Sequence, residues 1–487
     1  MRVILFMADE NSASQSVAIS TGRRIAILIA TGMAQFLVAV DYWSVAIAMP
    51  SMAQDLGVRT IDLQWVITGY VLTFSVMLGI AGPLGDRYGR KKILLIGVAL
   101  FGLVSIWVGA AQSANSVIAA RIALGIGGGL LLPLAASVLA DCTPSDQMTR
   151  FMALLTAVTA LGASTGPVLG GILTDSFLGW RWIFYANVPF SLLAFFMVMF
   201  LARESRDPQA KGRLDAIGIA LVILALSLIS VGVDRIPHWT IVAWASTCLG
   251  GILFLGLFVA WELKVQNPIV DLRLLGNRAF TGFTLAGLFS NSCWCVLIFT
   301  TTLLLQKVSG LNALNTGLYF LFLSGSIVVS STIAAKISDR TGTKPLVVIA
   351  LLLQGGAFLA LWFDHQLAFL AICLTVAGVG CAWGWSMPQA GAILTLPRER
   401  VGLASGSILT VMVMVANVFV VISATIIDAM SGTNGQDYAS GIQVTYLMGV
   451  GLAFAGLLSV AFVLPSHLSK SGQRPQETAE STAPSPN

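Results

Sequence analysis

Two ionisable residues, Asp41 and Arg121, lie deep inside long apolar segments of the chain. Asp41 begins the stretch DYWSVAIAMP, and Arg121 begins the stretch RIALGIGGG. A charge at the middle of a membrane helix costs roughly 2.5–3.5 kcal/mol even on a lenient insertion scale, so such a residue points to function. Burial favours the neutral acid, whereas a nearby arginine favours the carboxylate. Together these residue types could load and release a proton, or bind a cation.

The chain around these two residues indicates an all-α polytopic membrane protein. Its 487 residues are 56% hydrophobic and 10% charged, whereas a soluble domain carries about 25% charged residues. The mean hydropathy is +0.87, and the apolar runs lack the short alternation of outer-membrane barrels. We expect fourteen transmembrane helices, at residues 25–50, 63–84, 92–112, 116–140, 150–174, 183–202, 214–233, 239–262, 279–305, 313–337, 345–363, 367–396, 401–428 and 442–465.

The basic residues predict the orientation of these helices. With the N-terminus in the cytoplasm, most of the 27 Lys and Arg residues fall on the cytoplasmic side, as the positive-inside rule requires. Only four fall outside, namely Arg59, Arg181, Arg235 and Lys307. We therefore expect a multi-pass protein of the bacterial inner membrane with both termini in the cytoplasm.

A short internal repeat indicates two related halves. Residues 86–91 read DRYGRK and residues 339–344 read DRTGTK, after predicted helices 2 and 10. An offset of eight helices fits two six-helix halves with an extra helix pair between them, and parallel halves are a known transporter plan. The predicted parts are a cytoplasmic N-terminal segment at 1–24, an N-terminal six-helix bundle at 25–202, an inserted helix pair at 203–265, a C-terminal six-helix bundle at 266–467 and a disordered cytoplasmic tail at 468–487.

Several functions are not expected from this sequence. The loops are too short to fold as an ATP-hydrolysing module, and no phosphate-binding loop motif occurs. The six cysteines lack zinc-ligand spacing, and no cofactor or catalytic constellation is evident. We expect no enzyme, cofactor, metal or nucleic acid, so a proton gradient would supply the energy. No cleavable signal peptide is expected, and translation could begin at Met1 or Met7.

The stretch GPLGDRYGRKKILL at 82–95 is the most specific motif, and we expect it to fill a short cytoplasmic loop. It resembles the loop between helices 2 and 3 of the major facilitator superfamily, G-x-L-x-D-r-x-G-r-k. In that family the loop is a conformational latch whose ion pairs hold one state and break in the other. The resemblance assigns this role to Gly82, Gly85, Asp86, Arg87, Gly89 and Arg90, with Asp339 and Arg340 in the second half.

Three further stretches narrow the resemblance. GASTGPVLGG at 162–171 is similar to the antiporter signature of helix 5, whose residues here are Gly162, Gly166, Pro167, Gly170 and Gly171. RIALGIGGG is similar to the helix 4 signature, with Leu124 in place of the usual Gln. GWRWIFYANVP and DYWSVAIAMP resemble the fourteen-helix drug:proton antiporter branch, although Tyr42 and Trp43 depart from its helix 1 pattern.

The resemblance implies a proton-driven antiporter that exports hydrophobic, cationic small molecules by alternating access, as a monomer. Asp41 would couple proton entry to drug exit. The alternative for Asp41 and Arg121 is a structural ion pair, and the two residues are expected to face each other or a shared water pocket. A second hypothesis is an exporter of a natural product, antibiotic or metabolite, for which Arg121 would bind an anionic substrate. A membrane sensor built on the same fold is a third.

Other residues are weaker candidates. Asp428 is either a second coupling acid or an interfacial residue at the outer end of helix 13. Polar and aromatic side chains could line the cavity or stack on a flat cation, but could equally serve packing. These candidates are Asn291, Asn417, Gln389, Trp383, Trp385, Tyr319 and Phe320.

Overall fold

The described part of the molecule is entirely helical and has no strand, which confirms the predicted all-α class. The predicted tail at 468–487, most of the segment 1–24 and the choice between Met1 and Met7 lie outside the described residues. The computed structural model describes residues 20–465 except 145–146, 178, 207–214, 266–267, 269, 271, 365, 396–400 and 431–437.

Fourteen long helices make up the described fold, in agreement with the predicted number. Thirteen pass as single apolar spans, and α6 is bent by 41° between its two halves, so it makes the fourteenth. Short 3₁₀ turns η1 (Thr60–Leu63) and η2 (Leu272–Gly276) and a π turn η3 (Leu304–Val308) lie between them. The helices are α2 (Thr21–Leu56), α3 (Gln64–Tyr88), α4 (Arg90–Ala110), α5 (Ala114–Asp141), α6 (Met148–Thr174), α7 (Arg181–Leu201), α8 (Ala216–Asp234), α9 (Ile241–Glu262), α10 (Arg278–Leu303), α11 (Ala313–Thr341), α12 (Thr343–Phe363), α13 (Leu367–Leu394), α14 (Val401–Met430) and α15 (Tyr438–Phe462).

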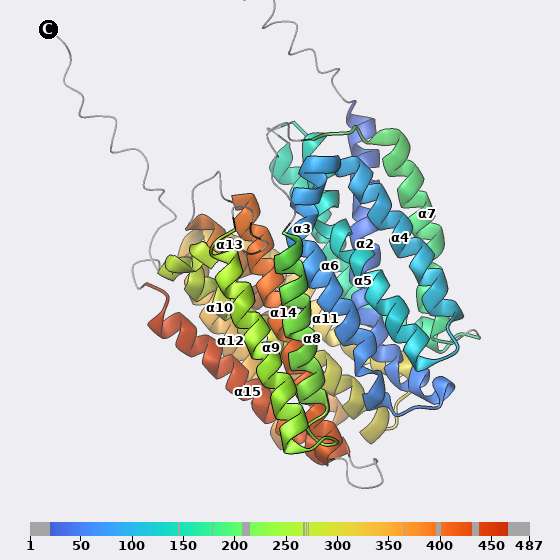
Figure 1. The fold of residues 1–487 in the computed structure, drawn as a ribbon, viewed down its shortest axis with the longest axis vertical. Helices are drawn as coiled ribbons and strands as arrows, with labels where there is room; N and C mark the ends of the chain where they lie inside the picture. The colour runs from blue at the N-terminus through green and yellow to red at the C-terminus, as the bar shows by residue number, and fades with distance from the viewer. Residues whose placement is uncertain are drawn as a thin grey trace, which may run out of the picture.

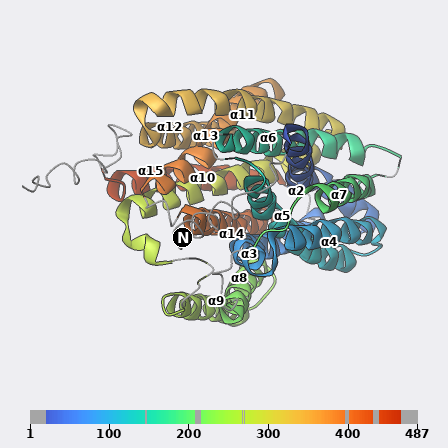
Figure 2. The same ribbon diagram turned by 90° about the horizontal axis from the view of Figure 1, so that it is seen from above.

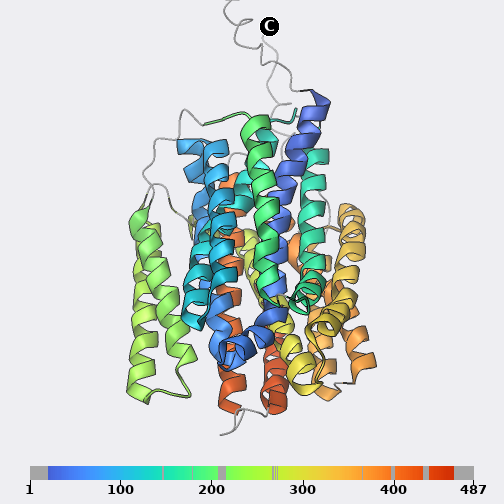
Figure 3. The same ribbon diagram turned by 90° about the vertical axis from the view of Figure 1, so that its right-hand side faces the viewer.

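The helices pack as two six-helix bundles with a peripheral pair (Figures 1 and 2). Helices α2 to α7 form the N-terminal bundle, and α10 to α15 form the C-terminal bundle. The bundles meet where α6 lies against α11 and α3 lies against α14. Helices α8 and α9 pack on each other at the edge, and α8 touches α3 and α14 (Figure 3). The predicted plan of two bundles plus an inserted pair is confirmed, while its residue boundaries remain predictions.

The two ends of the helices define two sides of the molecule. We call the side where α2 begins and α15 ends the terminal side, and the opposite side the far side (Figure 1). The α3–α4 and α11–α12 junctions lie on the terminal side. The α2–α3 and α8–α9 connections and the last turn of α14 lie on the far side. Each contact described below is assigned to the terminal side, the far side or the centre between them.

Helix α2 is longer than predicted. The sequence suggests an end at Pro50, but the helix continues through this proline and ends at Gly57, which has φ 66°. Glycine adopts this left-handed conformation without strain, and its N–H bonds to the last carbonyls of the helix, so it is the more effective stop. Asp41 lies near the middle of this 36-residue helix, deep in the apolar segment as the sequence predicts.

The predicted loop at 82–95 is wrong, because most of this motif is helical. Helix α3 runs to Tyr88 and α4 starts at Arg90, so Gly89 alone forms the break. Its φ of 109° and ψ of 121° are conformations that a residue with a Cβ rarely adopts. The second half repeats the arrangement, since α11 runs to Thr341, Gly342 has φ 79°, and α12 starts at Thr343.

A lysine at the same position of each repeat fastens the following helix. Lys91 donates from Nζ to the carbonyls of Met199 and Ala202 at the end of α7, at 2.6 and 2.9 Å. Lys344 donates to the carbonyls of Leu464 and Pro465, just after α15, at 3.1 and 3.2 Å. Each ammonium satisfies carbonyls that a helix end leaves unpaired. The repeat of six residues therefore encodes a repeated tertiary contact.

Candidate functional site

Asp41 and Arg121 form an ion pair in the centre of the N-terminal bundle. Arg121 Nη1 lies 2.5 Å from Asp41 Oδ2, and the side chains are 0% and 1% exposed. The second carboxylate oxygen of Asp41 accepts a hydrogen bond from Asn187 Nδ2 of α7 at 3.4 Å. The predicted meeting of these two residues is thus observed. Since a buried pair seldom adds net stability over apolar side chains, its presence fits a functional role.

The remaining contacts of Arg121 keep its charge satisfied without water. Its Nε donates to the backbone carbonyl of Val66 at 3.1 Å. The guanidinium lies over the ring of Tyr70, 4.0 Å from the centroid, and 5.8 Å from that of Phe184. A ring face attracts a cation most strongly where water is excluded. The positive charge therefore has partners other than Asp41, which allows the acid to change its own partner.

The antiporter-type motif of α6 positions α2, the helix that carries Asp41. Gly162, Gly166 and Gly170 lie one turn apart along one face of α6. A Cβ on Gly166 would stand 2.9 Å from Cβ of Trp43, and one on Gly170 would stand 2.7 Å from Cβ of Ser44. Only glycine permits such close approach of two membrane helices. The motif consequently sets the distance between α6 and the Asp41 segment.

The other end of this motif contacts the C-terminal bundle. A Cβ on Gly171 would stand 2.5 Å from the carbonyl oxygen of Ala313 in α11. Conversely, a Cβ on Gly317 of α11 would stand 2.7 Å from the carbonyl oxygen of Pro167. Asp175, at the end of α6, accepts a hydrogen bond from the N–H of Leu314 at 3.0 Å. The motif therefore joins the two bundles as well as packing within one.

Aromatic side chains next to Asp41 reach across to the C-terminal bundle. Trp43 stacks on Trp294 of α10, with ring centroids 4.7 Å apart and planes at 17°. Tyr42 Oη lies 3.8 Å from Sγ of Cys295. Trp385 of α13 meets Trp294 edge to face, with centroids 6.0 Å apart. Of the aromatic candidates from the sequence, Trp385 therefore belongs to this cluster.

Most of the other weaker candidates serve packing. Trp383 donates from Nε1 to the carbonyl of Ser330 at 3.1 Å, and Phe320 is fully buried. Asn291 donates to the carbonyl of Met412, and Gln389 donates to that of Trp385 on its own helix. Tyr319 contacts Phe322 on α11. Asn417 differs, because its buried amide has no hydrogen-bond partner among the described residues.

Asp428 lies far from the Asp41 pair, on the far side at the end of α14. It accepts a hydrogen bond from Arg59 at 2.8 Å and lies 2.8 Å from Nε2 of His238. Arg59 also pairs with Asp62 at 2.7 Å. The hydrogen bond that Arg59 donates to Asp62 and the charge of Asp428 raise the pKa of the Arg59 guanidinium above its already high value. Arg59 thus remains a permanent cation that joins the two bundles.

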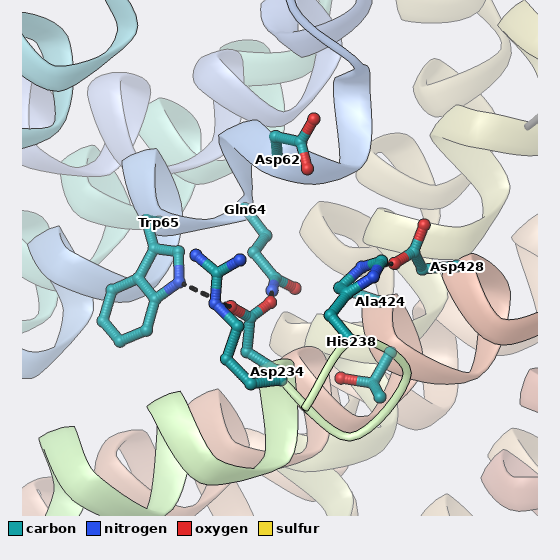
Figure 4. Close-up of a pocket in the computed structure, with 9 residues that line it drawn as sticks. Asp62, Gln64, Trp65, Asp234, His238, Ala424 and Asp428 are labelled. Carbon is teal, nitrogen blue, oxygen red and sulfur yellow. Dashed lines mark hydrogen bonds and ion pairs between the residues drawn. The ribbon is translucent and has the colours of Figure 1, made fainter. Parts of the chain in front are cut away.

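A small polar cavity of about 40 Å³ lies beside this cluster, between the inserted helix pair and the bundles (Figure 4). Asp234, the last residue of α8, accepts hydrogen bonds from Gln64 and from Trp65 Nε1, the latter at 3.3 Å. His238 comes from the connection between α8 and α9. Through these contacts the inserted pair is tied to α3 and, by way of Asp428, to α14.

The predicted latch forms a network within the N-terminal bundle on the terminal side. Arg90 pairs with Asp86 at 2.8 Å and with Asp141 at 2.5 Å, which joins α3, α4 and α5. Arg87 is exposed and lies 5.1 Å from the ring of Tyr88. In the second half Arg340 is exposed at the end of α11, and the side chain of Asp339 lies outside the described residues.

Four partners of these groups were missed from the sequence. Asp141 stands at the end of a predicted helix, where an acid usually reads as an interfacial residue. Asn187 and Tyr70 lie in apolar segments and carry no charge that would single them out. Trp294 lies between two cysteines in an apolar segment, where nothing in the sequence marks it for contact with Trp43. The stretch GWRWIFYANVP, which contains Asn187, was the one available signal.

Comparisons with known proteins agree with this arrangement. The family model described as "Major Facilitator Superfamily" matches residues 31–363 and 322–486. The "Multidrug resistance protein Stp" of Mycobacterium tuberculosis (strain CDC 1551 / Oshkosh) is 31% identical over 386 residues, which are 78% of this chain and 71% of the relative. The "Tetracenomycin C resistance and export protein" of Streptomyces glaucescens is 27% identical over 397 residues, 79% of this chain and 72% of the relative.

Solved structures show the same fold at low sequence identity. A D-xylose-proton symporter superposes with a TM-score of 0.66 at 16% identity, covering 92% of this chain and 99% of that chain. A bacterial homologue of the human lysosomal transporter Spinster, in an inward-facing conformation, has a TM-score of 0.66 at 14% identity, covering 93% of this chain and 100% of that chain. The chain therefore belongs to the major facilitator superfamily and is a membrane transporter rather than an enzyme.

Proposed function

We propose that the chain is a proton-driven antiporter that exports hydrophobic, cationic small molecules by alternating access. The observation that carries this proposal is the Asp41–Arg121 pair, fully buried at 2.5 Å in the middle of the membrane-spanning bundle. Multidrug resistance proteins among the relatives support drug export as the direction of transport. The proton gradient is the energy source, and neither ATP nor a cofactor takes part.

Asp41 is the group that couples the two movements. When a proton neutralises Asp41, the ion pair with Arg121 is lost, and the arginine keeps the ring of Tyr70 and the carbonyl of Val66. When the proton leaves, Asp41 is an anion that binds Arg121 or a substrate cation. Proton and cation therefore compete for one carboxylate, so that each expels the other.

Contacts between the bundles support closure of the far side in this conformation. Arg59 of the N-terminal bundle pairs with Asp428 of the C-terminal bundle at 2.8 Å. Gln306, in the π turn after α10, donates to the carbonyl of Ile47 in α2 at 2.8 Å. These bonds must break when the far side opens. In this assignment the far side is the exterior, the terminal side and both termini face the cytoplasm of a bacterium, and the transporter works as a monomer.

Transport in liposomes tests the role of Asp41. The protein is reconstituted with an imposed proton gradient, and movement of ethidium is followed for the natural protein and for Asp41→Asn. We expect the natural protein to transport and Asp41→Asn to fall to the level of empty liposomes. The matched control is Asp55→Asn on the same helix, which breaks an ion pair with Arg181 on the far side and should retain most transport.

The other outcomes have definite meanings. Equal transport by the natural protein and Asp41→Asn would make the buried pair structural, and Asp428 would be the next coupling acid to test. Loss in both aspartate variants would indicate a general packing defect, which thermal unfolding would reveal. No movement of any cation by the natural protein would contradict a cationic substrate.

A second candidate is an exporter of one natural product or antibiotic. It is favoured by the relative named for tetracenomycin C resistance and export. In this case an anionic group of the substrate would take the place of Asp41 and pair with the buried guanidinium of Arg121. Arg121→Gln should then abolish substrate binding, whereas Asp41→Asn should bind the anion more tightly. Direct binding of candidate antibiotics to both variants distinguishes the two proposals.

A further inference from the structure

Two consecutive residues of α2 meet two consecutive residues of α10 directly beside Asp41. Tyr42 approaches Cys295 at 3.8 Å, and Trp43 stacks on Trp294 with centroids 4.7 Å apart. Helix α2 belongs to one bundle and α10 to the other. The Trp43–Trp294 stack therefore crosses the interface between the bundles. Any motion that separates the bundles at this point moves the two indole rings apart and opens a gap between two flat faces.

The indole N–H of Trp294 lacks a hydrogen-bond partner within the described part of the chain, although the residue is only 7% exposed. A buried indole N–H normally finds an acceptor. Two other buried tryptophans follow that rule, since Trp383 donates to the carbonyl of Ser330 and Trp180 to the carboxylate of Asp55. A donor left without an acceptor at a bundle interface points to a ligand that brings one.

Neighbouring helices hold both tryptophans of the stack. Gly166 of α6 lies so close to Trp43 that an added Cβ would stand 2.9 Å from the Cβ of Trp43, so α6 fixes where this side chain leaves α2. Trp385 holds the edge of Trp294 with planes at 84°. A flat ring placed between the two indoles needs an extra separation of about 3.5 Å, which is one carbon–carbon contact distance. Such a displacement is small compared with the parting of two bundles.

We propose that Trp43 and Trp294 form a binding site for a flat polycyclic aromatic substrate that carries a carbonyl or phenolic oxygen. The substrate lies between the indoles, and the oxygen accepts the hydrogen bond from Trp294 Nε1. When the substrate leaves, the indoles stack on each other and the interface closes. This site rests on the proposed function and deepens it, because it names the shape and the acceptor group by which substrates are selected.

Equilibrium binding to purified protein tests the site without any gradient. Three probes are compared by flatness and by ring carbonyls: doxorubicin is flat and has ring carbonyls, ethidium is flat without them, and tetraphenylphosphonium is not flat. Quenching of tryptophan fluorescence and dialysis with radiolabelled probe give the Kd. We expect Trp43→Leu to weaken doxorubicin and ethidium about tenfold, the effect of one stacking contact. Binding of tetraphenylphosphonium should change less than twofold.

A second variant isolates the hydrogen bond. Trp294→Phe keeps a ring at this position but removes the N–H, so doxorubicin should bind about threefold to tenfold more weakly while ethidium is nearly unchanged. Trp43→Tyr should restore much of the stacking that Trp43→Leu removes. The control is Trp107→Leu on the exposed surface of α4, which should leave all three Kd values as they are.

The proposal is overturned if Trp43→Leu weakens all three probes equally, because the tryptophan would then serve packing alone. It is also overturned if neither variant changes any Kd, or if Trp294→Phe affects doxorubicin and ethidium to the same extent. Failure of the proposed antiport is separate, since it would leave these Kd values measurable while no probe moves in proton-loaded liposomes.

Discussion

The α3–α4 and α11–α12 junctions on the terminal side both turn at a glycine with positive φ, but they differ in charge. Gly89 and Gly342 both have positive φ, and Lys91 and Lys344 both hold the end of the last helix of their bundle. The position after the glycine differs, because Arg90 in the first half corresponds to Thr343 in the second. The repeated part is therefore architectural, whereas the Arg90 network is confined to the N-terminal bundle.

Among the described side chains, this difference gives the first junction an ion-pair network that Thr343 cannot form in the second. Glycine and lysine are needed wherever two helices must meet end to end against a third. A cation at the next position adds ion pairs to Asp86 and Asp141, at 2.8 and 2.5 Å. These side chains are about a quarter to a third exposed, so the pairs contribute little stability and are free to change with conformation.

The largest difference between the halves should follow from loss of the arginine. Arg90→Leu leaves Asp86 and Asp141 close together without their common cation, so one conformational state loses its latch. We expect the initial rate of ethidium transport in liposomes to fall about tenfold or more, which corresponds to about 1.4 kcal/mol. Thr343→Leu is the matched change in the second half and should stay within about twofold. Equal losses would contradict a latch in one half.

The next effect is on the stability of the protein rather than on its transport rate, and it follows from a side chain at the first glycine. Gly89→Ala should destabilise the protein by about 1–3 kcal/mol, because alanine is strained at φ 109° and its Cβ would lie 2.6 Å from Oε1 of Glu204. Gly82→Ala in the same motif meets no atom within 4 Å and should be neutral or stabilising. Thermal unfolding with a thiol-reactive dye measures both. A larger loss at Gly82 would refute the turn role of Gly89.

The lysines test the shared part of the comparison. Lys91→Met and Lys344→Met each remove two hydrogen bonds from an ammonium to carbonyls at a helix end. We expect each to cost about 1–3 kcal/mol and to lower the Tm by similar amounts, since hydrogen bonds to charged groups are the stronger ones. The Tm of the purified variants is the readout. A lower Tm for only one of the two variants would show that the two lysines do not contribute equally to stability.

The smallest effect is expected at Glu204, which has no counterpart in the repeat. Its carboxylate accepts the backbone N–H groups of Lys91 and Lys92, both at 3.1 Å, and so caps the start of α4. Glu204→Gln keeps the acceptor but removes the charge, so it should cost at most about 0.3–1 kcal/mol. The loss of Tm caused by Glu204→Gln should be smaller at high salt, where charge at an exposed helix end is screened. A loss of Tm that does not depend on salt would argue against a role for the charge of Glu204.

The charged groups inside the membrane were predictable from the sequence. A carboxylate and a guanidinium in apolar helices must find each other or water, so Asp41 and Arg121 could be paired although the predicted end of helix 1 at Pro50 was wrong. Asp428 was expected at the outer end of helix 13, either as a second coupling acid or as an interfacial residue, and in the structure it contacts Arg59 there. Charge is costly enough in a bilayer that it restricts the possible partners strongly.

The neutral partners were not predictable in this way. Asn187 and Tyr70 each look like ordinary residues of a membrane helix, and nothing in the order of residues says which neighbour they face. The break at Gly89 was also misread, because a polar, glycine-rich stretch is typical of a loop. In the structure α3 continues to Tyr88, and Asp86 in its last turn pairs with Arg90. Such a contact forms only in the folded protein, so the order of residues alone does not reveal it.

The sequence by itself determined the number of spans, the two related halves and the presence of a charge pair in the membrane. The spans and the charge pair follow from hydropathy and from the cost of burying charge, which act on each segment separately, and the halves follow from the repeated six-residue motif. Only the tertiary structure decided that Trp43 stacks on Trp294 and that Asp141 pairs with Arg90. Those contacts depend on the rotation and spacing of helices far apart in the chain, which close packing selects and a one-dimensional pattern does not record.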